Sequence, residues 1–154
     1  MAEKIDLNTL PKGLTKEEFT ALPNFKKIRS FFTWAGVVSI GSGILICSEI
    51  GKTAESVFQA GGSYDDMSRL WAVKLNMLFM IFDIVMGILL LKKKTTKMAY
   101  ILAITELVYI VLVLVLGGTI GIGAIAFLLA LAGAIRIDKK WKQYQEISGG
   151  SNQL

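Results

Sequence analysis

Residues 76–91 read NMLFMIFDIVMGILLL, residues 92–97 read KKKTTK, and residues 99–116 read AYILAITELVYIVLVLVL. The two long runs are almost entirely apolar, and inside a bilayer a helix lets such a run satisfy its own backbone hydrogen bonds. About 20 helical residues cross a hydrocarbon layer of roughly 30 Å. This stretch therefore predicts two membrane-spanning helices, over about 70–91 and 98–116. The short basic linker predicts that they are antiparallel neighbours.

Two more apolar stretches flank this hairpin, at about 31–50 and about 117–137. They are similar in length to the first two, so the sequence predicts four membrane-spanning helices. Of the 154 residues, 53% are hydrophobic and only 19% are charged, which is more apolar surface than one small soluble core can enclose. The expected fold class is all-α: a polytopic membrane protein with four transmembrane helices in an antiparallel bundle.

The predicted spans divide the chain into three parts. These are a cytoplasmic N-terminal segment at 1–30, a four-span membrane domain at 31–137, and a cytoplasmic tail at 138–154. Thr15 and Glu18 have the spacing of a capping box, which predicts a short interfacial helix over about 16–22. Between the first two spans, the loop over 51–69 is expected to contain one or two helical turns around TAESVFQA.

The positive charges predict how the chain is oriented in the membrane. All but three of its 17 Lys and Arg residues fall on one side of the predicted topology, and the exceptions are Lys52, Arg69 and Lys74. Because cytoplasmic loops are enriched in Lys and Arg, we expect both termini in the cytoplasm. Tryptophan is common at the membrane surface, and the chain carries it near predicted helix ends, at Trp34, Trp71 and Trp141.

The same charges suggest a lipid partner. The net charge of +5 is concentrated at the ends of apolar segments, so we expect contact with anionic head groups on the cytoplasmic side and no nucleic acid. FKKIRSFF at 25–32 is interpreted as an interfacial approach to the first span, with a specific lipid or partner site as the alternative. The expected location is the cell membrane as an integral multi-pass protein, with an internal membrane as the alternative.

Composition argues against an enzyme. The chain has no His and a single cysteine, Cys47, so it lacks the usual acid–base group at neutral pH and the commonest zinc ligand. We expect no catalytic residue, metal or cofactor. Cys47 lies in an apolar stretch and is expected to be a buried, inert thiol. The spacing of Gly121, Gly123 and Ala126 fits a dinucleotide fingerprint, but no predicted strand precedes it, so we reject that interpretation.

Two acidic residues lie inside the predicted spans. Asp83 is nine residues before Lys92, and Glu106 is nine residues after Lys97, so both are expected about 13.5 Å below the same membrane edge. An ionised acid facing lipid costs about 2.5 to 3.5 kcal/mol. We therefore expect the two carboxyls to face protein or water, level with each other, and to share or retain a proton.

Other polar residues are predicted to lie beside the two acids. Asn76 shares a helix face with Asp83, and Tyr109 shares one with Glu106. Together with Thr105 they form a candidate polar seam. Arg136, near the end of the fourth span, is expected to extend toward the cytoplasmic surface. The alternative is that it points into the membrane, joins this seam and pairs with one of the acids.

Small residues at four-residue spacing predict where helices approach closely. The candidate positions are Ser39 and Gly43 in the first span, and Gly117, Gly121, Ala126, Ala130 and Ala134 in the fourth. We interpret these contacts as lying within the bundle, and contacts between copies of the chain are the alternative.

Two functions fit these features. The first is a non-enzymatic small multi-pass membrane protein that assembles with, or modulates, other membrane components, with the acids holding helices together. The alternative is an oligomeric proton-coupled carrier or cation pathway in which Asp83 and Glu106 carry the ion. A homo-oligomer or a membrane-protein partner remains open in either case.

Overall fold

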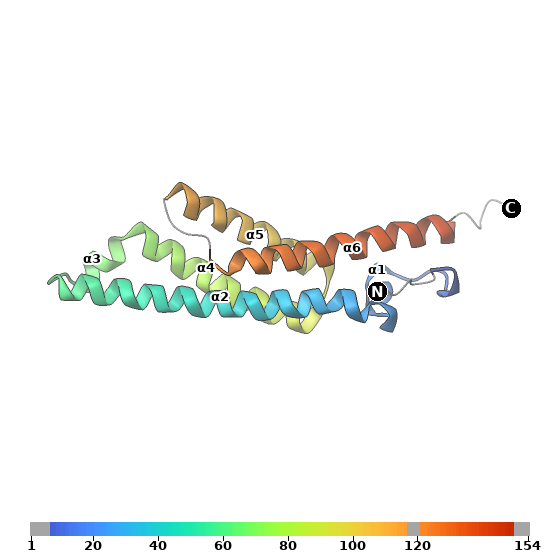
Figure 1. Cartoon of the computed structure of the whole chain (residues 1–154), viewed down its shortest axis with the longest axis horizontal. Helices are drawn as coiled ribbons and strands as arrows, with labels where there is room; N and C mark the ends of the chain where they lie inside the picture. Colours follow the sequence, from blue (N-terminus) through green and yellow to red (C-terminus); the bar gives the residue numbers. More distant parts are fainter. Residues whose placement is uncertain (1–6, 117–120, 150–154) are drawn as a thin grey trace.

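The computed structural model describes residues 7–116 and 121–149, apart from the side chains of 67–69. Every regular element in these residues is a helix. The long helices lie along the long axis of the molecule in alternating directions (Figure 1). They are α2 (Lys26–Gln59), α4 (Trp71–Lys93), α5 (Thr96–Val115) and α6 (Gly123–Gly149). The shorter elements are η1 (Leu7–Thr9), α1 (Lys16–Ala21), η2 (Pro23–Phe25) and α3 (Tyr64–Arg69).

Three helical stretches are long and apolar enough to cross a membrane. They are Pro23–Gln59, Trp71–Lys93 and Thr96–Val115, and they cover the first three predicted spans except for Leu70 and Leu116 at the ends of the second and third. The prediction of an all-helical chain with membrane-length apolar helices is thus confirmed for the described residues. The fourth span, the bundle of four spans and the orientation stay predictions.

α6 differs from the predicted fourth span at both ends. It begins at Gly123, part-way along α5 rather than beside the end of α5 (Figure 1), and residues 117–120 lie outside the described part of the chain. Arg136 is its first charged residue, and the helix continues to Gly149. Its uncharged part is therefore about 20 Å long at 1.5 Å per residue, shorter than a hydrocarbon layer of roughly 30 Å.

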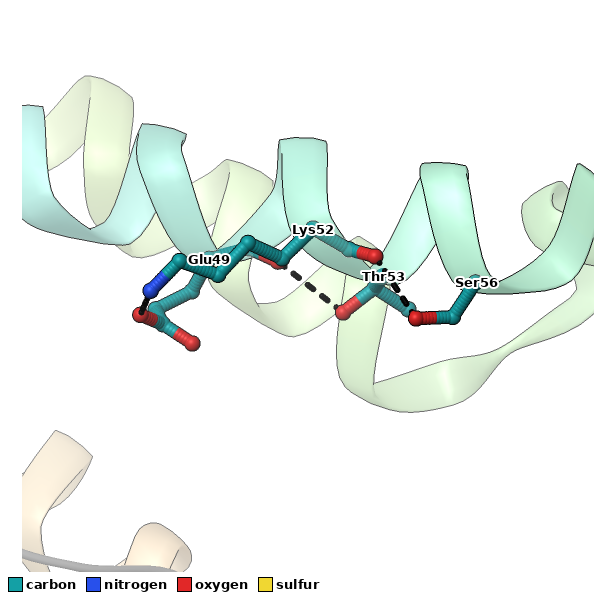
Figure 2. A network of polar contacts seen from close by, with 4 residues as sticks. All are labelled: Glu49, Lys52, Thr53 and Ser56. Atoms are coloured by element: carbon teal, nitrogen blue, oxygen red, sulfur yellow. Dashed lines mark hydrogen bonds and ion pairs between the residues drawn. The ribbon is translucent and has the colours of Figure 1, made fainter. Parts of the chain in front are cut away.

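α2 continues about two and a half turns beyond the predicted end of the first span. These polar turns are stabilised locally (Figure 2): the Thr53 hydroxyl donates to the Glu49 carbonyl at 2.9 Å, and the Lys52 ammonium donates to the Glu49 carboxylate at 2.8 Å. Gly61 follows the helix with a φ of 79°, a left-handed conformation that glycine adopts without strain. The turns predicted in the 51–69 loop are thus mostly part of one continuous helix.

The prediction that Cys47 is buried is wrong. Its side chain is exposed on α2. The buried positions of that helix continue from Ser39 and Gly43 to Ile46, and Cys47, the next residue, lies at the edge of this stripe, beyond its last buried position. An apolar run in a membrane helix does not distinguish a protein-facing position from a lipid-facing one.

Two glycines bring α2 and α4 into backbone contact. A Cβ added to Gly36 would lie 2.8 Å from the Gly87 carbonyl oxygen, and a Cβ added to Gly87 would lie 2.7 Å from the Gly36 carbonyl oxygen. α5 packs mainly on α6, whereas α4 and α5 contact each other less. The long helices can therefore be described as two pairs, α2 with α4 and α5 with α6, and α6 packs on α2 about as extensively as it packs on α5.

The N-terminal segment packs on the far part of α6 and forms a second, smaller core. The Phe19 ring centroid lies 4.5 Å from that of Phe25, 5.2 Å from that of Trp141 and 5.1 Å from that of Tyr144. The Tyr144 hydroxyl donates to the Pro11 carbonyl at 2.7 Å. The N-terminal segment and the predicted cytoplasmic tail, which are far apart in the sequence, are thus in contact.

α1 begins with the predicted capping box, which is confirmed. The Glu18 carboxylate accepts a hydrogen bond from the Thr15 amide at 2.9 Å, and the Thr15 hydroxyl accepts one from the Glu18 amide at 3.3 Å. The hydrogen bonds from the Thr15 amide and hydroxyl favour the charged carboxylate, so they hold the pKa of Glu18 below its usual 4.5.

The capping box predicts a pH dependence of α1. Because the Glu18 pKa is lowered on folding, its stabilisation is complete above pH 4.5 and is lost as the pH falls through the folded value. Hydrogen-exchange protection of the Thr15 amide, corrected for intrinsic rates, should therefore fall on acidification below that pH. Glu18→Gln should remove most of this pH dependence, and Glu17→Gln, at an exposed neighbour, should keep it. Equal dependence in both variants would contradict the assignment.

The glycine contact predicts a second effect. Gly36→Ala places a methyl group against the Gly87 carbonyl, and overpacking of this kind costs about 1–3 kcal/mol. Gly51→Ala is the matched control, since a Cβ there meets nothing within 4 Å. Thermal unfolding in neutral detergent should show a lower midpoint for Gly36→Ala and an unchanged or higher one for Gly51→Ala. Equal midpoints would mean that the two helices do not touch at this point.

Candidate functional site

Asp83 on α4 and Glu106 on α5 lie in the interior, where the two helix pairs meet. Each residue is 1% exposed, and the two are close enough to interact electrostatically. Both helices are apolar and long enough to cross a membrane. The two acids therefore point into the interior between the helices, and neither lies on the outer surface of its helix.

Two serines of α2 contact helix α4 at Asp83. The Ser39 hydroxyl donates to the Asp83 backbone carbonyl at 2.9 Å, and the Ser42 hydroxyl lies close enough to the Asp83 carboxyl to interact with it. Ser39 is fully buried and Ser42 is 4% exposed. These contacts join α2 to α4 about one turn from the contact between Gly36 and Gly87.

Glu106 lies directly against the start of α6. A Cβ added to Gly123 would overlap the Glu106 carboxyl, so only glycine fits at this position with the acid where it is. A pocket of about 10 Å³ adjoins the carboxyl, and its lining includes Tyr109, Val113 and Gly121. That volume is sufficient for about one water. Glu106 thus lies where α6 begins, next to a pocket the size of a single water.

Three oxygens of the acid pair have no hydrogen-bond partner among the described residues. They are Asp83 Oδ2 and both carboxyl oxygens of Glu106. A buried polar atom left unpaired costs about 1–3 kcal/mol. One proton held between the two acids makes one carboxyl a donor and the other an acceptor, and a water in the pocket can satisfy a further oxygen. The arrangement is suited to holding a proton.

Asn76 and Tyr109 join α4 to α5 on one side of the acids. The Tyr109 hydroxyl donates to Asn76 Oδ1 at 3.3 Å, and the Tyr109 ring lies 4.5 Å from the Phe79 ring, centroid to centroid. Tyr109 is also within electrostatic range of both acids. Thr105 is half-buried and does not hydrogen-bond to Glu106. Four of the predicted seam residues are therefore near one another, and Thr105 is not bonded to the acid beside it.

Arg136 lies away from the acids. It is exposed, and its guanidinium carbon is 4.5 Å above the centroid of the Phe31 ring on α2, a cation–π contact. The alternative in which Arg136 pairs with Asp83 or Glu106 is wrong for this structure. Gly123, which contacts Glu106, lies 13 residues and about 20 Å from Arg136 along α6, beyond the reach of the side chain.

The small residues fall into two groups. Ser39, Gly43, Ala126, Ala130 and Ala134 are buried, and a Cβ on Gly43 would lie 2.7 Å from Ile84 Cγ1. Gly121 is exposed, a Cβ there would meet nothing within 4 Å, and it precedes α6. Gly117 lies outside the described residues. The predicted close approach therefore has no counterpart at Gly121, because the helix starts after it.

A polar cluster that no sequence pattern indicates links three segments. Asp138 on α6 accepts a hydrogen bond from the Tyr100 hydroxyl at 2.8 Å and lies 2.7 Å from the Lys16 ammonium. The three residues are far apart along the chain, so no local spacing indicates the contact. The sequence offers one sign of this cluster: Asp138 is the single acid among the cations of 136–142.

Metal binding has little support in the described residues. No group of three or more Cys, Asp or Glu side chains in them could hold a metal ion, and the chain has no His. A pair of carboxyls offers fewer ligands than a protein calcium site uses.

No protein family, curated protein or solved structure matches the chain.

The position of Glu106 predicts a steric effect at Gly123. Gly123→Ala should destabilise the protein by about 1–3 kcal/mol, because the new methyl group displaces a buried carboxyl. Gly121→Ala is the control two residues away and should be neutral. In a double-mutant cycle measured by thermal unfolding in detergent, the Gly123→Ala penalty should shrink when Glu106 is shortened to Ala. Additive penalties would place Glu106 away from the start of α6.

Proposed function

We propose that this chain is a non-enzymatic membrane protein with four membrane-embedded helices, both termini in the cytoplasm, and a role in assembling with or modulating other membrane components. α2, α4 and α5 cross the bilayer. α6 begins inside it, at the level of Glu106, and leaves it on the cytoplasmic side. The cell membrane is the proposed location.

The distribution of charge supports this orientation. One cavity, at the end of the molecule where α1 lies, is lined by several cations, among them Lys16, Arg29, Lys93 and Lys97. Cations gathered at one end of apolar helices face the cytoplasm in most membrane proteins. At the other end, where α2 and α4 are joined, the described cations are Lys52, paired with Glu49, and Lys74.

The enclosure of the acid pair is the observation that favours an assembly role. Asp83 and Glu106 are each 1% exposed, backed by the α2 serines on one side and by Gly123 on the other. A proton held between them links the α2–α4 pair to the α5–α6 pair, as interhelical hydrogen bonds do in membranes. Such a link sets the shape that the chain presents to its neighbours.

The outer part of α5 is the surface proposed for a partner. α6 begins beside Glu106, so the nine residues of α5 beyond it extend about 13.5 Å past the start of α6. The exposed apolar residues there are Leu107, Val108, Val111, Leu114, Val115 and Leu116. A transmembrane helix of another component could pack on this surface, where α6 is absent.

The second candidate is the proton-coupled carrier or cation pathway. One observation favours it: the unpaired oxygens of Glu106 adjoin a pocket with room for about one water. Acids within a membrane often belong to proton relays. The two functions differ in whether the acids must titrate, which makes them separable by experiment.

The assembly role predicts that hydrogen bonding, not titration, is what matters at Asp83. Asp83→Asn keeps a donor and an acceptor at the acid pair, so it should co-purify with its membrane partner in mild detergent at close to the wild-type yield. Asp83→Leu leaves Glu106 buried without a partner, at about 1–3 kcal/mol, and should reduce the yield by roughly fivefold or more. The complex is measured by native mass analysis.

The carrier function is tested by measuring ion flux in proteoliposomes. On the assembly proposal, the purified wild-type chain carries no more proton or cation flux than protein-free vesicles. A wild-type flux that Asp83→Asn and Glu106→Gln abolish, and that Glu49→Gln preserves, would replace the assembly role with the carrier. Glu49 is a suitable control because it is exposed and lies far from the acid pair.

A further inference from the structure

A large cavity lies at the basic end of the molecule, where α1 and the start of α2 face the turn between α4 and α5. Its volume is about 540 Å³, which is within the size range of small-molecule sites. The lining combines α1, α2 and the KKKTTK linker, and it includes Thr20, Thr95, Thr96 and Tyr100. The cavity is distinct from the acid pair, which lies about nine residues deeper along α4 and α5.

The walls of this cavity carry an excess of positive charge. Five cations line it, namely Lys16, Arg29, Lys93, Lys94 and Lys97, against one acid, Glu17. Lys16 is paired with Asp138 at 2.7 Å. Among the described residues, the other four cations form no ion pair with an acid. Like charges held around one cavity repel each other, so an anion placed among them is favoured on electrostatic grounds.

The turn itself adds groups suited to a phosphate. α5 begins at Thr96 with Thr95 as its N-cap, whose hydroxyl already accepts from the Met98 amide, so the start of this helix and the positive end of its dipole are at the cavity. Thr96 is only 8% exposed and lines the cavity, and no described residue hydrogen-bonds to its hydroxyl. Its hydroxyl is therefore available to donate a hydrogen bond to a ligand in the cavity.

We propose that this cavity binds the phosphate-bearing head group of an anionic phospholipid. Arg29 is two residues before the apolar run of α2, and Lys93 and Lys97 flank the apolar runs of α4 and α5, so the cavity lies at the depth of lipid phosphates. Basic pockets between transmembrane helices on the cytoplasmic side are suited to such head groups. The proposal requires only that α2, α4 and α5 lie in a membrane, not that the chain has a protein partner.

The test is lipid binding by the full chain in neutral detergent, measured by native mass spectrometry. The probes are dioleoyl phosphatidic acid and, as a lipid without net charge, dioleoyl phosphatidylcholine. The wild-type chain should bind one phosphatidic acid in preference to phosphatidylcholine. Lys93→Gln with Lys97→Gln should weaken that binding by about tenfold or more. Both side chains are exposed, so the fold should persist, which unfolding without lipid verifies.

Lys139→Gln with Lys142→Gln is the matched control, because it removes the same charge from exposed positions on α6 outside the cavity. It should bind phosphatidic acid as the wild type does, and Lys93→Arg with Lys97→Arg should also retain binding. Equal loss in the control pair, or no preference over phosphatidylcholine, would overturn the proposal. Displacement of phosphatidic acid by an equal concentration of inorganic phosphate would also overturn it, since the site would then be one for free phosphate.

Discussion

The buried acids, Asp83 and Glu106, constrain how the long helices can be arranged. Polar atoms in an apolar interior must be enclosed and hydrogen-bonded. Neighbouring residues of four helices enclose the two carboxyls, and three carboxyl oxygens are left for a proton or a water to satisfy. Ser42 reaches Asp83 from α2, and α6 begins at Gly123, where a glycine leaves space for the Glu106 carboxyl. The same two residues therefore account for the serines on α2, the glycine on α6 and the point at which α6 starts.

A second constraint acts at the basic end. Phe19, Trp141 and Tyr144 form an aromatic core, and Asp138 binds Lys16 and Tyr100. These contacts hold α1 against α6 and thereby form one wall of the cationic cavity. The N-terminal segment is thus a structural part of the molecule, which explains why a cavity forms between segments that are far apart in sequence.

The sequence was sufficient for features that depend on local spacing. The capping box at Thr15 and Glu18 and three apolar helices of membrane length were predictable because caps and apolar runs are local signals. The start of α6 was not, because it depends on the contact between Gly123 and Glu106 on another helix. The exposure of Cys47 and the partners of Asp138 were missed for the same reason: apolar sequence does not indicate which helix face meets protein. Equal distances to the linker predict that the two acids lie at one level, whereas their neighbours on α2 and α6 could not be derived from spacing.

The late start of α6 affects how the molecule fills a bilayer. In the proposed topology, four of the described helices occupy the cytoplasmic leaflet, and only α2, α4 and α5 continue into the opposite one. The chain then has a larger cross-section in one leaflet than in the other and acts as a wedge. Lipids around it must compensate for that difference in area, so the protein favours membrane of one curvature over the other.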